Sequence, residues 1–403
     1  MLRSLLSTWP LFLGLALIMI GNGIQLVLLG VRASTTGNSN LITGVMMGGY
    51  FLGFFIGSII VPNTLSKVGH IRTFGALASI ASASILIHLL FFDPISWGIL
   101  RVITGFCYAG MFIVVESWLN EKATNKTRGQ ILSIYMIITM TGLGAGQLIS
   151  GFDDGVSIDL FLVASVLVSI AVVPVLITAA KAPDFEAPDM ISFRRLIQIS
   201  PLALIGLFVN GIVVAMLLGI GVIYAKNIGL TTAQTSLFMA SVTIGVFCLQ
   251  YPIGWISDRF DRRLVILATC LSAALFALIL NMLGKDNYAL LLLFMALYGG
   301  TSLTLYSLFI AHANDYLTPS QMVSTSSSLV MANGIGAVIG APMVAASMDL
   351  IGNWSYFSLI GTIHFVLAIF IIYRMMVRPS IPSEAQGPLI LLPETATATA
   401  VSL

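Results

Sequence analysis

Twelve long apolar runs follow one another from Trp9 to about Val377, and almost every charged residue lies between them. An α-helix needs roughly 20 apolar residues to cross the hydrocarbon core of a bilayer, and each run has about that length. Only 8% of the 403 residues are charged, whereas soluble domains carry about 25%. The sequence therefore predicts an all-α membrane protein with twelve transmembrane helices and no separate soluble catalytic domain.

The predicted helices form two sets of six, separated by the longest polar interruption. The expected spans are 9–31, 41–65, 72–92, 97–119, 129–150, 158–180, 201–225, 232–256, 263–283, 287–311, 321–349 and 354–377. The corresponding domains are an N-terminal bundle (1–180), a cytoplasmic linker (181–200), a C-terminal bundle (201–378) and a tail (379–403). The tail is short, weakly charged and ends in a Thr-Ala repeat, so we expect it to be disordered.

The distribution of basic residues predicts the orientation. If both termini face the cytoplasm, fourteen of the 18 Lys and Arg residues lie on that side. The far side then carries only Arg32, Lys226 and Lys285, and Arg101 lies within the membrane. Cytoplasmic loops are enriched in Lys and Arg. We therefore expect a multi-pass protein of the bacterial inner membrane with both termini in the cytoplasm.

The two halves repeat local features. Each has a basic turn after its second helix and a glycine-rich fifth helix, at 142–146 in the first half and 334–340 in the second. Paired six-helix halves with a binding site between them are a transporter architecture.

On these features the chain resembles the major facilitator superfamily over essentially its whole length. The family loop G-x-x-x-D-R-x-G-R resembles the stretch from Gly254 to Arg263, with Asp261 where glycine is usual. The first-half copy is weaker, because Ser66 stands at the acidic position. Arg101 and Gly105 resemble the R-x-x-x-G pattern of the fourth helix. The run 114–117, together with 128–129, looks most like the poorly characterised bacterial YcaD-like group.

The resemblance implies gating residues that bridge the halves while the cytoplasmic side is closed. Glu121 and Arg128 have the spacing of a glutamate-to-arginine pattern in sugar porters. The alternative is that the basic members only anchor loops to anionic lipids. The expected gating residues are Asp258, Arg259, Arg262, Arg263, Lys67, Arg72, Glu121 and Arg128.

Only two charged side chains, Arg101 and Glu116, lie well within a run, and both are in the fourth. Intramembrane charges usually mark a pathway or a working site. They lie on broadly one helix face but about 22 Å apart along the axis, so they cannot pair. Arg101 either reaches a central cavity, where it attracts an anionic group or takes part in proton coupling by tuning a titrating neighbour, or extends to the outer interface. Glu116 is either a proton-binding carboxylate or part of a salt bridge to Arg128 or Arg72.

By resemblance, the first, fourth, seventh and tenth helices line the central cavity. Polar residues in and near these helices are the candidates for substrate contact, although interhelical hydrogen bonding is the alternative for each. The expected substrate-binding residues are Asn22, Gln25, Arg101, Tyr108, Asn210, Gln250, Tyr298, Thr301 and Ser302.

The sequence therefore predicts a proton-coupled secondary transporter for a small amphipathic solute or an organic anion, working by alternating access. Two alternatives stay open: a receptor or scaffold that kept the fold without transport, and an intramembrane enzyme. We expect a monomer in the lipid bilayer, with a small-molecule substrate, protons as the coupling ion, and no metal, cofactor or nucleic acid. The three cysteines lie inside apolar runs without the spacing of a metal site.

Overall fold

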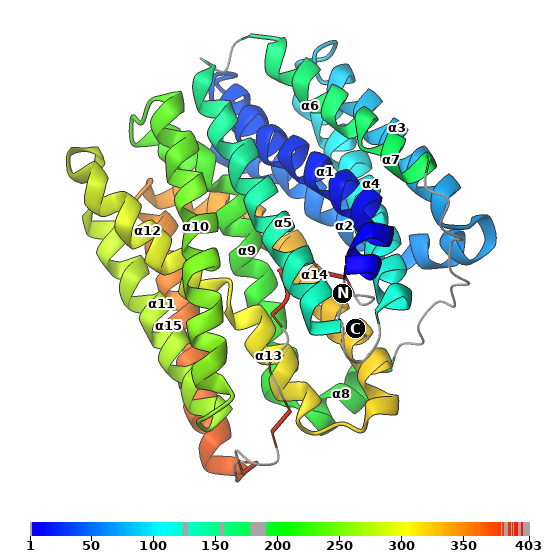
Figure 1. Ribbon diagram of the computed structural model, residues 1–403. Helices are drawn as coiled ribbons and strands as arrows, with labels where there is room; N and C mark the ends of the chain where they lie inside the picture. The colour runs from blue at the N-terminus through cyan, green and yellow to red at the C-terminus, as the bar shows by residue number, and fades with distance from the viewer. Residues whose placement is uncertain are drawn as a thin grey trace.

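The computed structural model describes residues 2–123, 128–153, 157–177, 191–379, 381–382, 386–387, 389, 391–393 and 396–397. Within these residues, 12 helices are long and apolar enough to cross a membrane. They pack side by side in one bundle, and both ends of the described chain lie towards the same side of it (Figure 1). The predicted all-α fold with twelve spans is confirmed.

Each half contains six spans, and the sixth and tenth spans of the chain each consist of two consecutive α-helices. The first half comprises α1 (Leu2–Ser34), α2 (Asn40–Val68), α3 (His70–Ile87), α4 (Pro94–Lys122), α5 (Arg128–Ile149), the 3-10 helix η1 (Ser150–Phe152), α6 (Asp159–Ile170) and α7 (Val172–Leu176). The second comprises α9 (Pro201–Asn227), α10 (Thr232–Ser257), α11 (Arg262–Met282), the 3-10 helix η2 (Lys285–Asn287), α12 (Tyr288–Ser302), α13 (Leu305–Asn314), α14 (Pro319–Ile351) and α15 (Ser355–Val377). In the expected linker, the described residues form the short helix α8 (Phe193–Ile199).

Several helices begin at capping residues that the sequence supplies. The Asp93 side chain accepts a hydrogen bond from the Ser96 backbone N–H at 2.9 Å, and Pro94 follows as the first residue of α4. Thr231 and Gln234 form a reciprocal capping box at the start of α10. Such caps satisfy backbone N–H groups that have no partner within the helix, and they fix where a span begins.

Within each half, backbones meet at glycines, and the same helix pairs are used twice. A side-chain carbon added at the glycine would overlap a carbonyl oxygen of the neighbouring helix. Between the second and fourth spans of each half the pairs are Gly53 with Val102 and Gly105 with Tyr50 in the first half, and Gly245 with Ala296 in the second. Between the first and fifth spans of each half they are Gly23 with Leu143 in the first half, and Gly211 with Asn333 and Gly336 with Phe208 in the second. The two halves thus repeat in packing as well as in sequence.

The halves contact each other mainly near one end of the bundle. We call this end the far face, and the opposite end, where α1 begins and α15 ends, the terminal face. Near the far face, Gly44 of α2 packs against Ala345 of α14, and Gly30 of α1 packs against Val222 of α9. At the far face itself, Asp349 of α14 accepts hydrogen bonds from Asn40 at the start of α2 at 2.8 and 3.0 Å. The bundle is therefore closed towards the far face.

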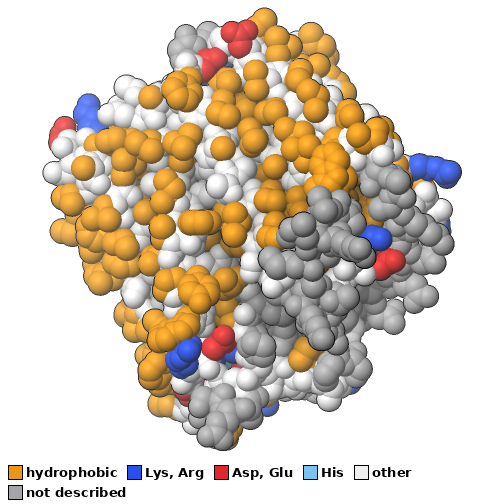
Figure 2. Space-filling model, viewed as in Figure 1, with side chains coloured by type: hydrophobic (Ala, Val, Ile, Leu, Met, Phe, Trp, Pro, Cys, Tyr) orange, Lys and Arg blue, Asp and Glu red, His pale blue; other side chains and the backbone are white. Residues whose placement is uncertain are grey.

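The outer surface of the bundle is apolar. Figure 2 shows hydrophobic side chains over most of the visible described surface, with the charged ones mainly towards its edges. Large apolar side chains such as Ile99, Val166 and Leu278 are more than half exposed there. A surface of this kind needs a hydrocarbon solvent, so the chain is a multi-pass membrane protein.

Candidate functional site

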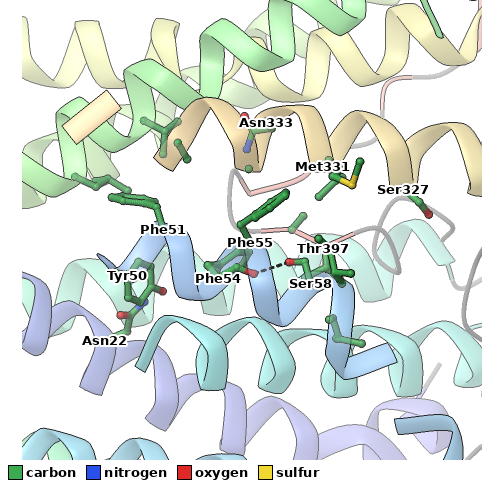
Figure 3. Close-up of a pocket in the computed structure, with 18 of the residues that line it drawn as sticks. Asn22, Tyr50, Phe51, Phe54, Phe55, Ser58, Ser327, Met331, Asn333 and Thr397 are labelled. Carbon is green, nitrogen blue, oxygen red and sulfur yellow. Dashed lines mark hydrogen bonds between the residues drawn. The ribbon is translucent and has the colours of Figure 1, made fainter. Parts of the chain in front are cut away.

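A cavity of about 170 Å³ lies between the two halves. It extends from mid-depth, at Asn22 and Arg101, to the terminal-face part of α2, at Pro62 and Asn63. Its two long walls are α2 in the first half and α14 in the second (Figure 3). Because the halves are in contact near the far face, the cavity opens towards the terminal face.

Aromatic residues of α2 form one wall. Tyr50, Phe54 and Ser58 are four residues apart, as are Phe51 and Phe55, so all five lie on one side of the helix and face the cavity (Figure 3). The Ser58 hydroxyl donates a hydrogen bond to the Phe54 carbonyl at 2.9 Å, so it is satisfied within its own helix. This wall offers flat apolar surfaces with few polar groups.

Arg101 lies in the cavity wall at mid-depth. This position agrees with the expectation that Arg101 reaches a central cavity, and not with the alternative that it extends to the outer interface. Only 3% of its surface is exposed, and its guanidinium carbon lies 4.6 Å from the centre of the Tyr50 ring. Its Nε has no hydrogen-bond partner among the described residues, and none of the described carboxylates forms an ion pair with it. A buried cation without an anionic partner is costly, so this position favours an anionic or electron-rich ligand.

Amides contribute further polar groups to the cavity. Asn22 of α1 lines it directly. Asn210 of α9 reaches it indirectly, because its Nδ2 donates to Oδ1 of Asn333, a lining residue of α14, at 3.2 Å. Gln25, one turn from Asn22, is 1% exposed, and neither of its side-chain polar atoms has a partner in the described chain.

Four of the expected substrate-binding residues pack inside one half instead. Tyr108 is fully buried beside Tyr50, with 6.1 Å between the ring centres. Ser302 bonds to the phenol of Tyr298 at 3.3 Å and to Nε2 of His364 at 3.1 Å. Thr301 bonds only to carbonyls of its own helix. None of the four lines the cavity. The three on α12, Tyr298, Thr301 and Ser302, form hydrogen bonds with partners in their own half.

Glu116 lies near the terminal-face end of α4 and is fully buried. The Tyr135 hydroxyl donates to its Oε1 at 2.5 Å. The backbone N–H of Thr397, in the C-terminal tail, donates to both carboxylate oxygens at 3.2 and 3.3 Å, and the Thr397 hydroxyl donates to Oε2. Of the two expected salt-bridge partners, Arg72 is exposed at the start of α3, and the side chain of Arg128 lies outside the described residues.

The described residues of the tail contact the bundle, and the expected disorder of the tail as a whole stays a prediction. Leu392, Ala396 and Thr397 are 1–2% exposed, and the last two line the cavity. Gln250, expected to contact substrate, donates to the Leu392 carbonyl at 3.0 Å. The backbone of the described tail residues thus has polar partners inside the opening between the halves.

The expected gating residues lie at the terminal face, and the buried ones among them make contacts within the second half. Arg262 donates to both oxygens of Asp315 at 2.7 Å, and it lies 3.4 Å from Asp258. Arg263 pairs with Asp261 at 3.0 Å. The exposed members are Asp258, Arg259, which stacks on Trp255, and Lys67, Arg72 and Glu121. Because the terminal-face side is open, the expected bridging of the halves stays a prediction.

Several lining residues were absent from the expected site, namely Phe51, Phe54, Phe55, Ser327, Met331 and Asn333. They belong to the second and eleventh spans, whereas the resemblance directed attention to the first, fourth, seventh and tenth. The four-residue spacing of aromatic side chains along α2 is a signal that could have identified this wall.

A bundle of two repeated six-helix halves around a central cavity defines the class of membrane transporters. The model of the Major Facilitator Superfamily matches residues 11–192 and 203–400. The chain therefore belongs to the major facilitator superfamily, as the resemblance predicted, and it is a transporter-family protein and not an enzyme.

Known relatives and structures agree with this assignment. The chain is 26% identical over 328 residues to the uncharacterized MFS-type transporter YcaD of Escherichia coli O6:K15:H31, covering 80% of this chain and 84% of that protein. It is 24% identical over 325 residues to YcaD of Escherichia fergusonii, with the same two coverages of 80% and 84%.

Two solved structures share the fold at low sequence identity. A mutant of the nucleoside transporter NupG has a TM-score of 0.76 at 14% identity, covering 91% of this chain and 99% of that one. The D-xylose-proton symporter has a TM-score of 0.71 at 13% identity, covering 90% and 96%.

Proposed function

We propose that this protein carries a small amphipathic solute or an organic anion across the membrane by alternating access. The observation that carries the proposal is Arg101, a buried guanidinium in the wall of the cavity between the halves, without an ionic partner among the described residues. A ligand carboxylate or similar group would supply the missing charge and accept hydrogen bonds from the planar guanidinium.

The rest of the cavity supports an amphipathic ligand. The Tyr50, Phe51, Phe54 and Phe55 rings offer apolar contact, and Asn22 and Asn333 offer amide hydrogen bonds. Arg101 is the only cationic residue among those that line the described cavity. A di-acid or a phosphate ester would be better matched by several convergent cations, so a monoanion or a neutral amphipathic solute fits best.

The proposed orientation puts the terminal face in the cytoplasm and the far face outside, in a bacterial inner membrane. Its support is the excess of Lys and Arg on the terminal-face side. In this orientation the structure corresponds to an inward-open state, with the cavity on the cytoplasmic side of the contact between the halves. The cavity lies between the two halves of a single chain, which is consistent with a monomer as the transporting unit.

Proton coupling is the second part of the proposal, and Glu116 is its proposed carrier. Glu116 is fully buried at the terminal-face end of α4, next to the opening through which a proton would enter or leave. Its neighbours Tyr135 and Thr397 donate hydrogen bonds to it, so the carboxylate acts as an acceptor in this state. One fold neighbour is a D-xylose-proton symporter, so the fold is compatible with coupling to protons.

Thermal unfolding of the purified protein with a panel of organic monoanions and their neutral analogues tests the substrate class. Compounds that raise the unfolding temperature are then tested for uptake into proteoliposomes with and without a pH gradient. We expect a stabilising monoanion to be taken up, and we expect a pH gradient to increase its accumulation. No flux of any stabilising compound would favour the scaffold alternative, and flux that ignores the gradient would remove proton coupling.

A further inference from the structure

The described parts of the C-terminal tail return from the end of α15 to the middle of the bundle (Figure 1). We propose that the terminal-face opening is a binding site for this segment, and that the bound segment keeps the two halves apart. The ligand is an extended peptide that belongs to the same chain. The inference goes beyond the transported solute, but it rests on the proposed alternating access.

The first contacts of the segment are with charged residues at the terminal-face ends of α10, α11 and α13. The Gly387 carbonyl accepts a hydrogen bond from Nη2 of Arg262 at 2.6 Å, and its N–H donates to Oδ1 of Asp315 at 3.1 Å. The N–H of Leu389 donates to Oδ1 of Asp258 at 2.8 Å. The expected gating residues of the second half therefore bind the backbone of the segment in this state.

Further into the opening, both backbone polar groups of Leu392, its N–H and its carbonyl, form hydrogen bonds. Its N–H donates to the hydroxyl of Ser307 on α13 at 3.0 Å, and its carbonyl accepts from the same hydroxyl at 3.0 Å. The side-chain amide of Gln250 on α10 donates to this carbonyl as well, at 3.0 Å. Leu392 is 2% exposed, so these bonds are shielded from water.

The segment then crosses from the second half to the first. The phenol of Tyr306 on α13 donates to the Ala396 carbonyl at 3.0 Å. The next residue, Thr397, donates its N–H to Glu116 on α4 at 3.2 Å. Consecutive residues are thus bound to opposite halves, and the peptide occupies the space between them.

The chemistry of the contacts indicates peptide recognition. Gly387, Leu389, Leu392 and Ala396 are bound through backbone N–H and carbonyl groups, as in other proteins that bind extended peptides. For the terminal face to close, α4 of the first half and α13 of the second must approach each other. They cannot do so while the segment lies between them, so the segment must leave before the protein can open towards the far face.

Spin-label distances test whether the segment restrains the halves. Labels at Thr64→Cys and Gln321→Cys report the separation of α2 and α14 at the terminal face, in a background with Ala at the three native cysteines. We expect one long distance in the full chain. In a chain ending at Pro379, we expect a second population shorter by roughly 5 Å or more, the width of one extended strand. Equal distributions in the two proteins would overturn the restraint.

A far-face pair, Thr36→Cys with Leu350→Cys, separates this inference from the function it rests on. If the far-face pair shows more than one distance in both proteins while the terminal-face distributions are equal, the result counts only against the proposed restraint by the segment. If the far-face pair shows one and the same distance in both proteins, the result overturns the restraint and also counts against alternating access.

Peptide binding tests the site itself. A fluorescein-labelled synthetic peptide of residues 386–403 should bind the chain that ends at Pro379. Ser307→Ala should weaken binding about tenfold or more, because two hydrogen bonds to Leu392 are lost. Ser79→Ala is the matched control, because Ser79 is exposed on α3 and bonds to a carbonyl of its own helix. Absence of binding, or equal binding by the Ser307→Ala and control proteins, would overturn the site.

Discussion

Replacing Arg101 with methionine should change ligand affinity and the stability of the empty protein in opposite directions. Methionine keeps much of the apolar length of arginine but removes the cation. In the empty protein, Arg101 is buried without an ionic partner among the described residues, and its guanidinium lies 4.6 Å from the centre of the Tyr50 ring. The cation–π contact contributes about 2 kcal/mol when desolvated, which is less than the several kcal/mol that burial of a charge costs.

We therefore expect Arg101→Met to raise the unfolding free energy of the empty protein by about 1–3 kcal/mol. A bound monoanion would lose two charge-assisted hydrogen bonds to the guanidinium. That loss costs at least about 3 kcal/mol, or roughly 150-fold in affinity. A neutral analogue should lose only about 1 kcal/mol, which corresponds to roughly fivefold. Thermal unfolding without ligand, and titration with a matched anion and neutral compound, measure both quantities.

Two further variants make the test specific. Arg101→Lys keeps the charge but not the planar pair of donors, so its anion affinity should lie between those of the native protein and Arg101→Met. Ile99→Met, two residues away on the same helix and 57% exposed, should leave affinity and stability unchanged. If Arg101→Met is less stable when empty, or loses affinity for anion and neutral analogue equally, the guanidinium has a structural role and the reasoning is wrong.

Three more predictions concern packing, coupling and the terminal face. Gly53→Val should abolish the folded monomer peak in size-exclusion chromatography, because any side chain at this position overlaps the α4 backbone. Gly75→Ala should be tolerated, because the nearest atom to a Cβ at that position lies 3.8 Å away. Glu116→Gln should abolish gradient-driven accumulation but spare exchange; full accumulation would remove Glu116 from the coupling mechanism. Asp315→Asn should lower the unfolding free energy by about 3–5 kcal/mol, since it breaks a buried ion pair with Arg262; an unchanged melting temperature would contradict this.

The fold could be predicted because hydrophobic length alone determines which segments cross a bilayer. Every apolar run became a spanning helix, and the short polar interruptions became turns between helices. Arg101 and Asn22 could be named as candidates for the cavity, since polar groups in a membrane helix need a polar environment, and both line it.

The rest of the site depends on contacts between residues far apart in the chain. One partner of Ser302 is His364, 62 residues away, and no local pattern in the sequence indicates this contact. Glu116 meets Thr397 across 281 residues. Composition describes a segment alone, so it could not indicate the backbone partners that other helices supply to the described residues of the tail.

The position of the contact between α2 and α14 determines how far the terminal face can move. Gly44 and Gly48 pack against α14 at Ala345 and Pro342, so the halves would pivot near this level. From Gly48 to Val68, α2 extends about 30 Å, at 1.5 Å per residue. A rotation of only about 10° around the pivot would displace its end by about 5 Å, the spacing of neighbouring extended strands. A small angular change therefore separates a gap that admits one peptide from a gap that admits none.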